Sequence, residues 1–137
     1  MADWRLLVAV AMGSAIGAML RFSLSLWLVP DPVTQLPWST LTVNVLGSAL
    51  IGFYAVATEP EGYWSVSPVF RVFVVAGFCG GFTTFSFFSL EMIQMLLQGS
   101  VTLALVYAVL SLLLWLAAGA LGIFVGSRLN ERTQKSR

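Results

Sequence analysis

The segment GFCGGFTTFSFFS, residues 77–89, places glycines, hydroxyl groups and aromatic rings inside a long stretch without charge. Gly80 and Gly81 each weaken a helix by about 1 kcal/mol, and the β-branched Thr83 and Thr84 resist helix formation slightly. A helix interrupted here exposes carbonyl oxygens from its first half, which suit a hard cation. Its second half begins with free N–H groups, which suit an anion. These residue types therefore favour an ion-binding break over an ordinary helix.

Phenylalanines follow this break at close spacing. Phe85 and Phe88 are three residues apart and share one face of a helix. Isolated phenylalanines would be assigned to lipid or core contacts. Beside a polar break, that packing interpretation is no longer the preferred one.

Single polar residues interrupt other apolar stretches. Arg21 lies well inside one of them, where an arginine is costly and either faces protein or water or extends to the membrane interface. Thr40 and Asn44 share a helix face, and a buried amide must be hydrogen-bonded. Asn44 therefore either joins helices or offers a donor to a passing ion. Tyr107 and Ser111 are also four residues apart, and the Ser111 hydroxyl can bond back to its own helix.

Four apolar stretches must position these residues, each near the length of about 20 residues that spans a bilayer. The 137-residue chain has 58% hydrophobic and only 9% charged residues, whereas soluble domains have about 25% charged residues. The sequence predicts one all-α membrane domain with four transmembrane helices, the third broken in mid-membrane. The predicted spans are residues 4–28, 38–57, 69–97 and 101–125, and a polar C-terminal tail follows at 128–137.

Charge and composition restrict orientation and function. Four spans put both termini and the middle loop on one side, which is predicted to be cytoplasmic because lysine and arginine gather there. The residues concerned are Arg5, Arg71, Arg128, Arg132, Lys135 and Arg137. The net charge of +1 gives no basic patch for nucleic acid. The chain has no histidine, so an enzyme is the least supported class.

The segment GFCGGFTTFSFFS resembles the signature of the Fluc family of fluoride channels, also called CrcB proteins. The resemblance extends over most of the chain: to GAMLR, ending at Arg21, to WSTLTVNVLGSALIGF, containing Asn44, and to the Tyr107–Ser111 pair. It implies a bacterial inner-membrane protein that forms an antiparallel dual-topology dimer. Such a dimer exports cytoplasmic fluoride passively through two pathways and confers fluoride resistance.

The resemblance also implies the site residues. A structural sodium ion at the dimer centre is expected to be held by backbone carbonyls of Gly80 and Thr83. Phe85 and Phe88 match two family phenylalanines whose weakly positive ring edges face fluoride. Stripping fluoride of water costs tens of kcal/mol in an ideal low-dielectric medium, so several partners are needed. The expected anion pathway comprises Arg21, Thr40, Asn44, Thr84, Phe85, Ser86, Phe88, Tyr107 and Ser111.

Two positions depart from the family pattern. Family members commonly have threonine where this chain has Phe87, and serine or threonine where it has Trp115. Both changes remove a hydroxyl group from the expected line of polar side chains, so the sequence leaves open whether both pathways conduct well. The one-sided lysine and arginine distribution also leaves two assemblies open, an antiparallel homodimer and a heterodimer with a related subunit.

Two other functions compete with a channel. A small multidrug-type transporter also has four short spans, but it needs a membrane-embedded carboxylate, and Glu91 near the end of the third span is the only candidate. A non-conducting scaffold would explain stripes of small residues, such as Gly13 and Gly17. It would not explain a broken helix lined by threonine, serine and phenylalanine.

Overall fold

Local signals fix several helix ends in the computed structural model, which describes residues 3–28, 36–59 and 62–135. The Asp3 carboxylate caps the first helix by accepting a hydrogen bond from the Arg5 N–H at 3.0 Å. The Ser67 hydroxyl accepts one from the Phe70 N–H at 3.2 Å at the start of the third. Gly99, with φ of +77°, allows the tight turn before the last helix.

The described residues form helices and no strand, as expected for an all-α protein. The elements are α1 (Trp4–Trp27), α2 (Trp38–Ala57), α3 (Pro68–Val72), the π-helix η1 (Phe73–Cys79), α4 (Gly80–Phe82), α5 (Ser86–Leu97) and α6 (Val101–Lys135). Four segments are long and apolar enough to cross a membrane: α1, α2, the run from α3 to α5, and α6 up to Glu131. The helix α6 continues through the polar tail as far as Lys135.

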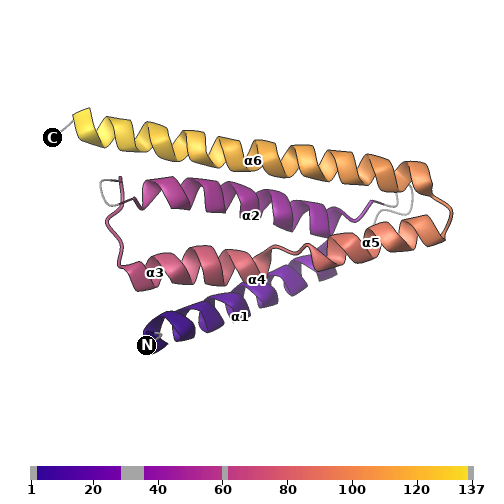
Figure 1. Cartoon of the computed structure of the whole chain (residues 1–137), viewed down its shortest axis with the longest axis horizontal. Helices are drawn as coiled ribbons and strands as arrows, with labels where there is room; N and C mark the ends of the chain where they lie inside the picture. The colour runs from indigo at the N-terminus through magenta and orange to yellow at the C-terminus, as the bar shows by residue number, and fades with distance from the viewer. Residues whose placement is uncertain (1–2, 29–35, 60–61, 136–137) are drawn as a thin grey trace.

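The helices lie side by side as an elongated bundle. Figure 1 shows α6 running along α2, and α1 crossing the run of α3, η1 and α4. Both termini and the α2–α3 connection lie at one end, while the α5–α6 turn lies at the other. This arrangement agrees with the prediction that four spans bring both termini to the same side.

Small residues let the helix backbones approach closely, as the spacing of Gly13 and Gly17 predicts. A Cβ atom at Gly13 would collide with the Phe73 carbonyl oxygen, and one at Gly17 with that of Phe78. In the same way, a Cβ atom at Gly122 of α6 would collide with the backbone of α2. These glycines pack α1 against η1 and α4, and α6 against α2.

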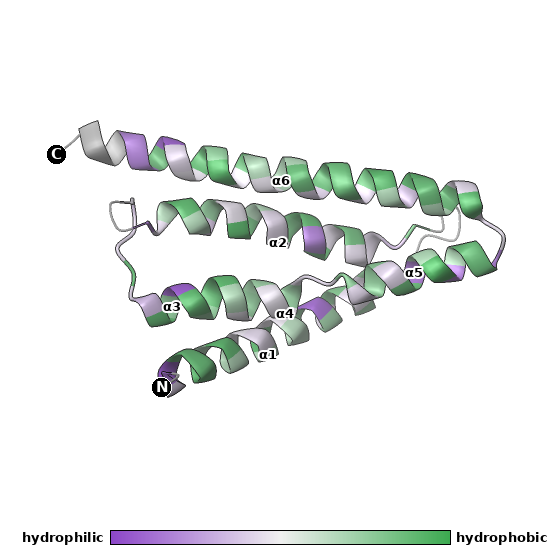
Figure 2. Ribbon diagram, in the orientation of Figure 1, coloured by the Kyte–Doolittle hydropathy of each residue, from purple (hydrophilic) through white to green (hydrophobic). Residues whose placement is uncertain are grey.

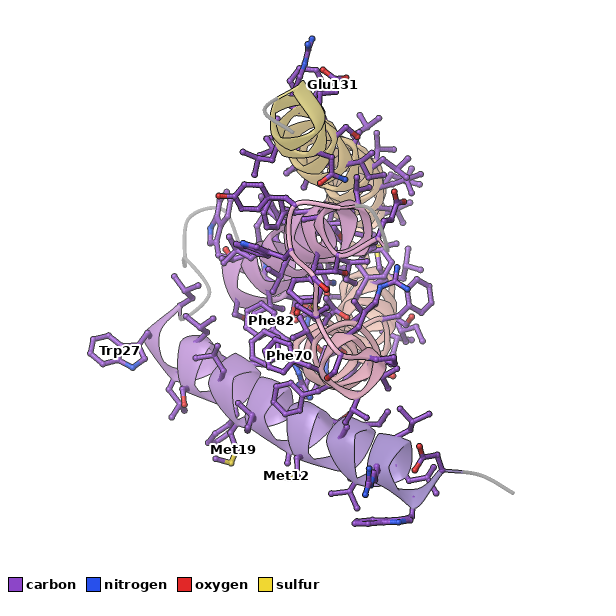
Figure 3. The ribbon with its side chains drawn as sticks, turned by 90° about the vertical axis from the view of Figure 1, so that its left-hand side faces the viewer. Met12, Met19, Trp27, Phe70, Phe82 and Glu131 are labelled. Atoms are coloured by element: carbon purple, nitrogen blue, oxygen red, sulfur yellow. The ribbon has the colours of Figure 1, made fainter. Side chains whose placement is uncertain are left out.

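The outer surface of the bundle is largely apolar. Met12, Met19 and Trp27 project from α1 away from the other helices (Figure 3), and Trp27 is 85% exposed. Hydrophobic residues cover the long helices, and most hydrophilic colour lies near the chain ends and α3, with a few isolated positions inside the bundle (Figure 2). A membrane provides apolar surroundings for such a surface. The chain is therefore a multi-pass membrane protein.

Candidate ion pathway

Regular helix stops between α4 and α5. Thr83 has extended backbone angles, with φ −80° and ψ 159°, and α5 begins three residues later at Ser86. The Thr83 N–H and hydroxyl both donate to the Cys79 carbonyl, at 2.9 and 2.8 Å. Thr83 therefore closes the first half of the helix with its own side chain before the chain leaves helical geometry.

Two backbone donors are diverted at this interruption. In a continuous helix the N–H of Thr84 would bond the Gly80 carbonyl, and the N–H of Phe87 would bond the Thr83 carbonyl. Instead, the Thr84 N–H donates to Asn44 Oδ1 at 2.8 Å, and the Phe87 N–H donates to Thr84 Oγ1 at 3.2 Å. The carbonyls of Gly80 and Thr83 consequently lose their helical donors.

Asn44 of α2 braces this interruption. Its Oδ1 accepts from the Thr84 N–H, and its Nδ2 donates to the Thr84 carbonyl, both at 2.8 Å. One buried amide, 5% exposed, thus satisfies both backbone polar groups of Thr84. The sequence left two roles open for Asn44, and among the described residues it joins α2 to the interrupted third span. The second hydrogen of Nδ2 is not used by this pair.

Arg21 of α1 faces protein rather than the membrane interface. Its Nε donates to the Gly81 carbonyl at 3.2 Å, and its guanidinium carbon lies 5.3 Å from the centre of the Phe87 ring. In a continuous helix, that carbonyl would accept from the Phe85 N–H. Arg21 therefore satisfies another carbonyl of the interruption, and Phe87 gives its charge an aromatic partner.

Glu91 of α5 joins two other candidate residues. The Thr40 hydroxyl donates to Glu91 Oε1 at 2.6 Å, and the Tyr107 hydroxyl donates to Oε2 at 2.7 Å. Both donors are buried, so α2, α5 and α6 meet at one carboxylate. The sequence-based interpretation treated Glu91 only as a possible transporter carboxylate. It did not predict that Thr40 and Tyr107 would donate hydrogen bonds to it. A lone carboxylate in an apolar span, which must find donors, was the available signal.

The Phe88 ring is the centre of an aromatic cluster. Its centroid lies 5.6 Å from that of Phe85, 5.2 Å from that of Tyr107 and 5.0 Å from that of Trp115. Phe85 is 71% exposed, so this cluster opens onto the surface of the chain. Ser111 is completely buried on α6, one helical turn after Tyr107.

Two cavities adjoin the interruption, and Thr84 lines both. The first, the Arg21 cavity, has a volume of about 190 Å³ and is lined by Arg21, Phe22, Ser25, Ser39, Thr40, Val43, Thr84, Phe87 and Glu91. The second, the Trp115 cavity, has a volume of about 200 Å³ and is lined by Asn44, Ser48, Ile51, Thr83, Thr84, Phe85 and Trp115. Ser86 and Gly80 are exposed and line neither.

A comparison with protein families identifies this arrangement. The model described as "CrcB-like protein, Camphor Resistance (CrcB)" matches residues 8–123. The chain belongs to the CrcB family. The matched region contains every candidate residue from Arg21 to Trp115 and ends before the polar tail.

Several CrcB relatives are similar over nearly their whole length. "Fluoride-specific ion channel FluC 3" of Brucella abortus biovar 1 is 46% identical over 128 residues, which is 93% of either chain. "Fluoride-specific ion channel FluC 1" of Rhodopseudomonas palustris is 44% identical over 89% of this chain and 86% of the relative. "Fluoride-specific ion channel FluC" of Opitutus terrae is 43% identical over 89% of this chain and 92% of the relative.

Proposed function

We propose that this chain forms a fluoride-selective channel in the bacterial inner membrane, through which cytoplasmic fluoride leaves down its gradient. The observation that carries the proposal is the interruption at residues 83–85, set between two cavities in a chain whose relatives are named fluoride-specific ion channels. The CrcB family and the names of these relatives support ion conduction, so we propose that the chain acts as a channel and not as an enzyme.

Weak donors around the interruption can replace the water of a bare fluoride ion. The free N–H of the Asn44 amide, the Thr84 hydroxyl and the Ser111 hydroxyl can each donate to an anion. The edges of the Phe85 and Phe88 rings carry partial positive charge. None of these groups is a full cation, so the ion can bind and still leave, as conduction requires.

Two charged side chains line the Arg21 cavity, which we take as the entrance of the pathway. Arg21 and Glu91 line the same cavity, which extends to Thr84. The positive charge of Arg21 would raise the local concentration of anions. Two hydroxyl donors, from Thr40 and Tyr107, hold the Glu91 carboxylate and weaken its repulsion of an approaching anion.

A second copy in antiparallel orientation would complete the pathway. Phe85 is 71% exposed, and the space above Gly80 is open, since a Cβ atom there would meet nothing within 4 Å. Ring edges exposed in this way need a protein surface opposite them to enclose an ion. We favour a homodimer. A heterodimer remains the alternative because Arg5, Arg71 and Arg128 all lie towards the end with both termini.

A sodium ion fits the two carbonyls left without helical donors. Gly80 and Thr83 of each copy would offer neutral oxygens, which suit a hard monovalent cation when no carboxylate is present. When bound, sodium would stabilise carbonyls that lipid cannot satisfy and would place positive charge beside the anion pathways. The support for this site is the diversion of the Thr84 and Phe87 N–H groups to other acceptors.

Liposomes that contain only this chain test the function and the assembly together. We expect rapid fluoride efflux without a proton gradient and negligible chloride efflux, because a homodimer would be complete. Efflux that requires a proton gradient would contradict a channel and favour a transporter. Efflux that appears only with a related second chain would contradict the homodimer, and none in either case would favour a scaffold.

Removal of sodium tests the shared cation. After long dialysis against a large organic cation, we expect flux to fall by about tenfold or more, equivalent to about 1.4 kcal/mol. Because the proposed ligands are backbone atoms, the ion must be changed rather than a side chain. Fluoride efflux and the dimer fraction should be measured together, and both should recover when sodium is restored. Unchanged flux and assembly in sodium-free buffer would refute the site.

A further inference from the structure

An apolar groove lies between α2 and α6 and shares no residue with the two cavities at the interruption. It has a volume of about 350 Å³, and every residue that lines it is apolar. Leu46, Leu50 and Phe53 form its wall on α2, and Leu121 and Val125 form its wall on α6. Leu46 is 52% exposed and Leu121 60%, so the described chain leaves this groove open.

Small residues form the floor of the groove. Gly122 of α6 rests against the backbone of Ala49 and Phe53 of α2, so closely that a Cβ atom on Gly122 would collide with both. The groove therefore follows from the same small-residue packing that joins α2 to α6.

The groove faces away from the side that we propose for the second copy. Ser48 of α2 lines the Trp115 cavity together with Phe85. Leu46 and Leu50 are each two residues from Ser48, which places them about 200° around the helix. The groove and the Trp115 cavity are consequently on opposite faces of α2. A second copy that covers Phe85 leaves the groove to lipid.

The groove has a length and depth that match one leaflet of the membrane. Leu46 is near the middle of α2, and the groove runs from there towards the end of the bundle that holds both termini (Figure 1). Leu46 and Phe53 are about 10 Å apart along a helix, and half of the hydrocarbon core is about 15 Å thick. An acyl chain that enters from the headgroup layer at this end can therefore follow the groove to mid-membrane.

A positive charge lies at the headgroup end of the groove. Arg128 continues the line of Leu121 and Val125 at the next turn of α6, and its side chain is 62% exposed. The Glu131 carboxylate lies 3.6 Å from its guanidinium group, but an exposed pair of this kind contributes little. The planar fork of an arginine matches the oxygens of a phosphate group. Arg128 can therefore bind the phosphate of a lipid whose acyl chain occupies the groove.

An aromatic contact and a backbone clamp fix the loop at this end. Trp64 meets the Phe53 ring edge to face, with centroids 5.6 Å apart, and tryptophan is enriched where lipid headgroups begin. Asn130 of α6 holds the preceding residue, because its Oδ1 accepts from the Tyr63 N–H at 2.7 Å. The mouth of the groove thus combines an apolar interior with a positive rim at the level of the headgroups.

We propose that the α2–α6 groove binds one anionic phospholipid, with an acyl chain between the helices and the phosphate group at Arg128. Lipid tails are as apolar as leucine, so the apolar wall alone does not select a lipid. The charge of Arg128 provides the selection, because a basic residue near the membrane surface attracts a lipid with a net negative charge. The site is on the lipid-facing side of the chain, so its occupancy does not depend on fluoride conduction.

Native mass spectrometry of the detergent-solubilised protein counts the bound lipid. Given equal amounts of phosphatidylglycerol and phosphatidylcholine with identical acyl chains, we expect one phosphatidylglycerol to be retained per chain. Phosphatidylcholine should bind about fivefold more weakly, which corresponds to the attraction of one arginine for an anionic lipid. Glycerol phosphate, which has the phosphate but no acyl chain, should not displace the lipid. Equal retention of the two lipids, or displacement by glycerol phosphate, would overturn the proposal.

Arginine variants test the contact with the headgroup. Arg128→Gln should lower the affinity for phosphatidylglycerol about fivefold, and Arg128→Lys, which keeps the charge but not the planar fork, should lower it less. The matched control is Arg5→Gln. Arg5 is also exposed at this end, stacks on Trp4 at 5.9 Å as Arg128 stacks on Phe124 at 5.0 Å, and lies outside the groove. Equal losses in Arg128→Gln and Arg5→Gln would indicate a general attraction to positive charge and contradict a specific site.

A larger side chain in the groove tests the contact with the acyl chain. Val125→Trp should fill the groove, so retention of phosphatidylglycerol should fall about tenfold and added lipid should no longer raise Tm. Val8→Trp is the control, since Val8 is 46% exposed on α1 and lies outside the groove. The dimer should persist in both variants. Unchanged lipid retention in folded Val125→Trp protein would contradict the site, and loss of its dimer would assign the groove to a second copy instead.

These measurements also separate the lipid site from the proposed channel. A chain that retains phosphatidylglycerol selectively but conducts no fluoride would refute the channel and leave the lipid site intact. A chain that conducts fluoride but retains neither lipid in preference would refute the lipid site and leave the channel intact.

Discussion

Asn44→Asp is expected to reduce fluoride flux by roughly a thousandfold. Two unit charges 4 Å apart repel by about 4 kcal/mol at an effective dielectric constant near 20, which corresponds to about three powers of ten in rate. The aspartate would also lack the Nδ2 donor that bonds the Thr84 carbonyl at 2.8 Å, so two oxygens would face each other there. Fluoride efflux per assembled dimer is the measurement.

Asn130→Asp provides a matched control for this variant. Asn130 of α6 also clamps the backbone, because its Oδ1 accepts from the Tyr63 N–H at 2.7 Å and its Nδ2 donates to the Val56 carbonyl at 2.9 Å. It lines neither cavity, so its variant should keep near wild-type flux despite the same chemical change. Equal loss of flux in both variants would attribute the effect to a broken clamp. Normal flux in folded Asn44→Asp protein would place this residue outside the pathway.

Apolar length and small-residue spacing predict the fold well because they depend only on the local chain. Runs of about 20 apolar residues define the spans, and Gly13 and Gly17 lie at the expected close helix contact. The common face of Thr40 and Asn44 is also confirmed, since both bond residues of the third span. The length of an apolar run is sufficient for the spans, and helical periodicity is sufficient for the glycine contacts and the shared face.

The partners across helices could not be predicted from the sequence. Spacing along α2 places Asn44 on a face but does not set the crossing register that brings it to Thr84, 40 residues away. For the same reason, the bonds from Thr40 and Tyr107 to Glu91 were missed. Each depends on how three helices meet, and hydrophobic packing fixes that only when the whole bundle is formed.

Arg21 and Ser86 show that residue type alone does not predict where a side chain lies in the bundle. The sequence left Arg21 between a functional position and the membrane interface, and the Gly81 carbonyl with the Phe87 ring now holds it inside the bundle. Ser86 was a candidate because of its hydroxyl, yet it is exposed and lines neither cavity. Its role in the pathway stays a prediction that depends on what a second copy places opposite it.

The Phe85→Ile and Phe88→Ile variants should separate ring edges that touch the ion from rings that only pack. A donor contact to a charged group is worth about 2 kcal/mol, so loss of one ring-edge contact to the anion should reduce flux by roughly thirtyfold. Isoleucine keeps the apolar character but has no positive edge. Phe85 is 71% exposed, so its replacement should cost little folding free energy within one chain.

Phe88 needs a separate comparison because it also packs against Tyr107 and Trp115. Each aromatic pair contributes about 0.5–1.5 kcal/mol to stability, so Phe88→Ile should lower both stability and flux. Phe124→Ile is the control for an exposed ring: Phe124 is 54% exposed on α6, beside Arg128 and outside both cavities. Flux per dimer should be compared at equal dimer fraction. Full flux in both Phe85→Ile and Phe88→Ile would show that these rings only pack. Removal of a contact with the ion in a dry pathway must change the free-energy barrier to fluoride permeation.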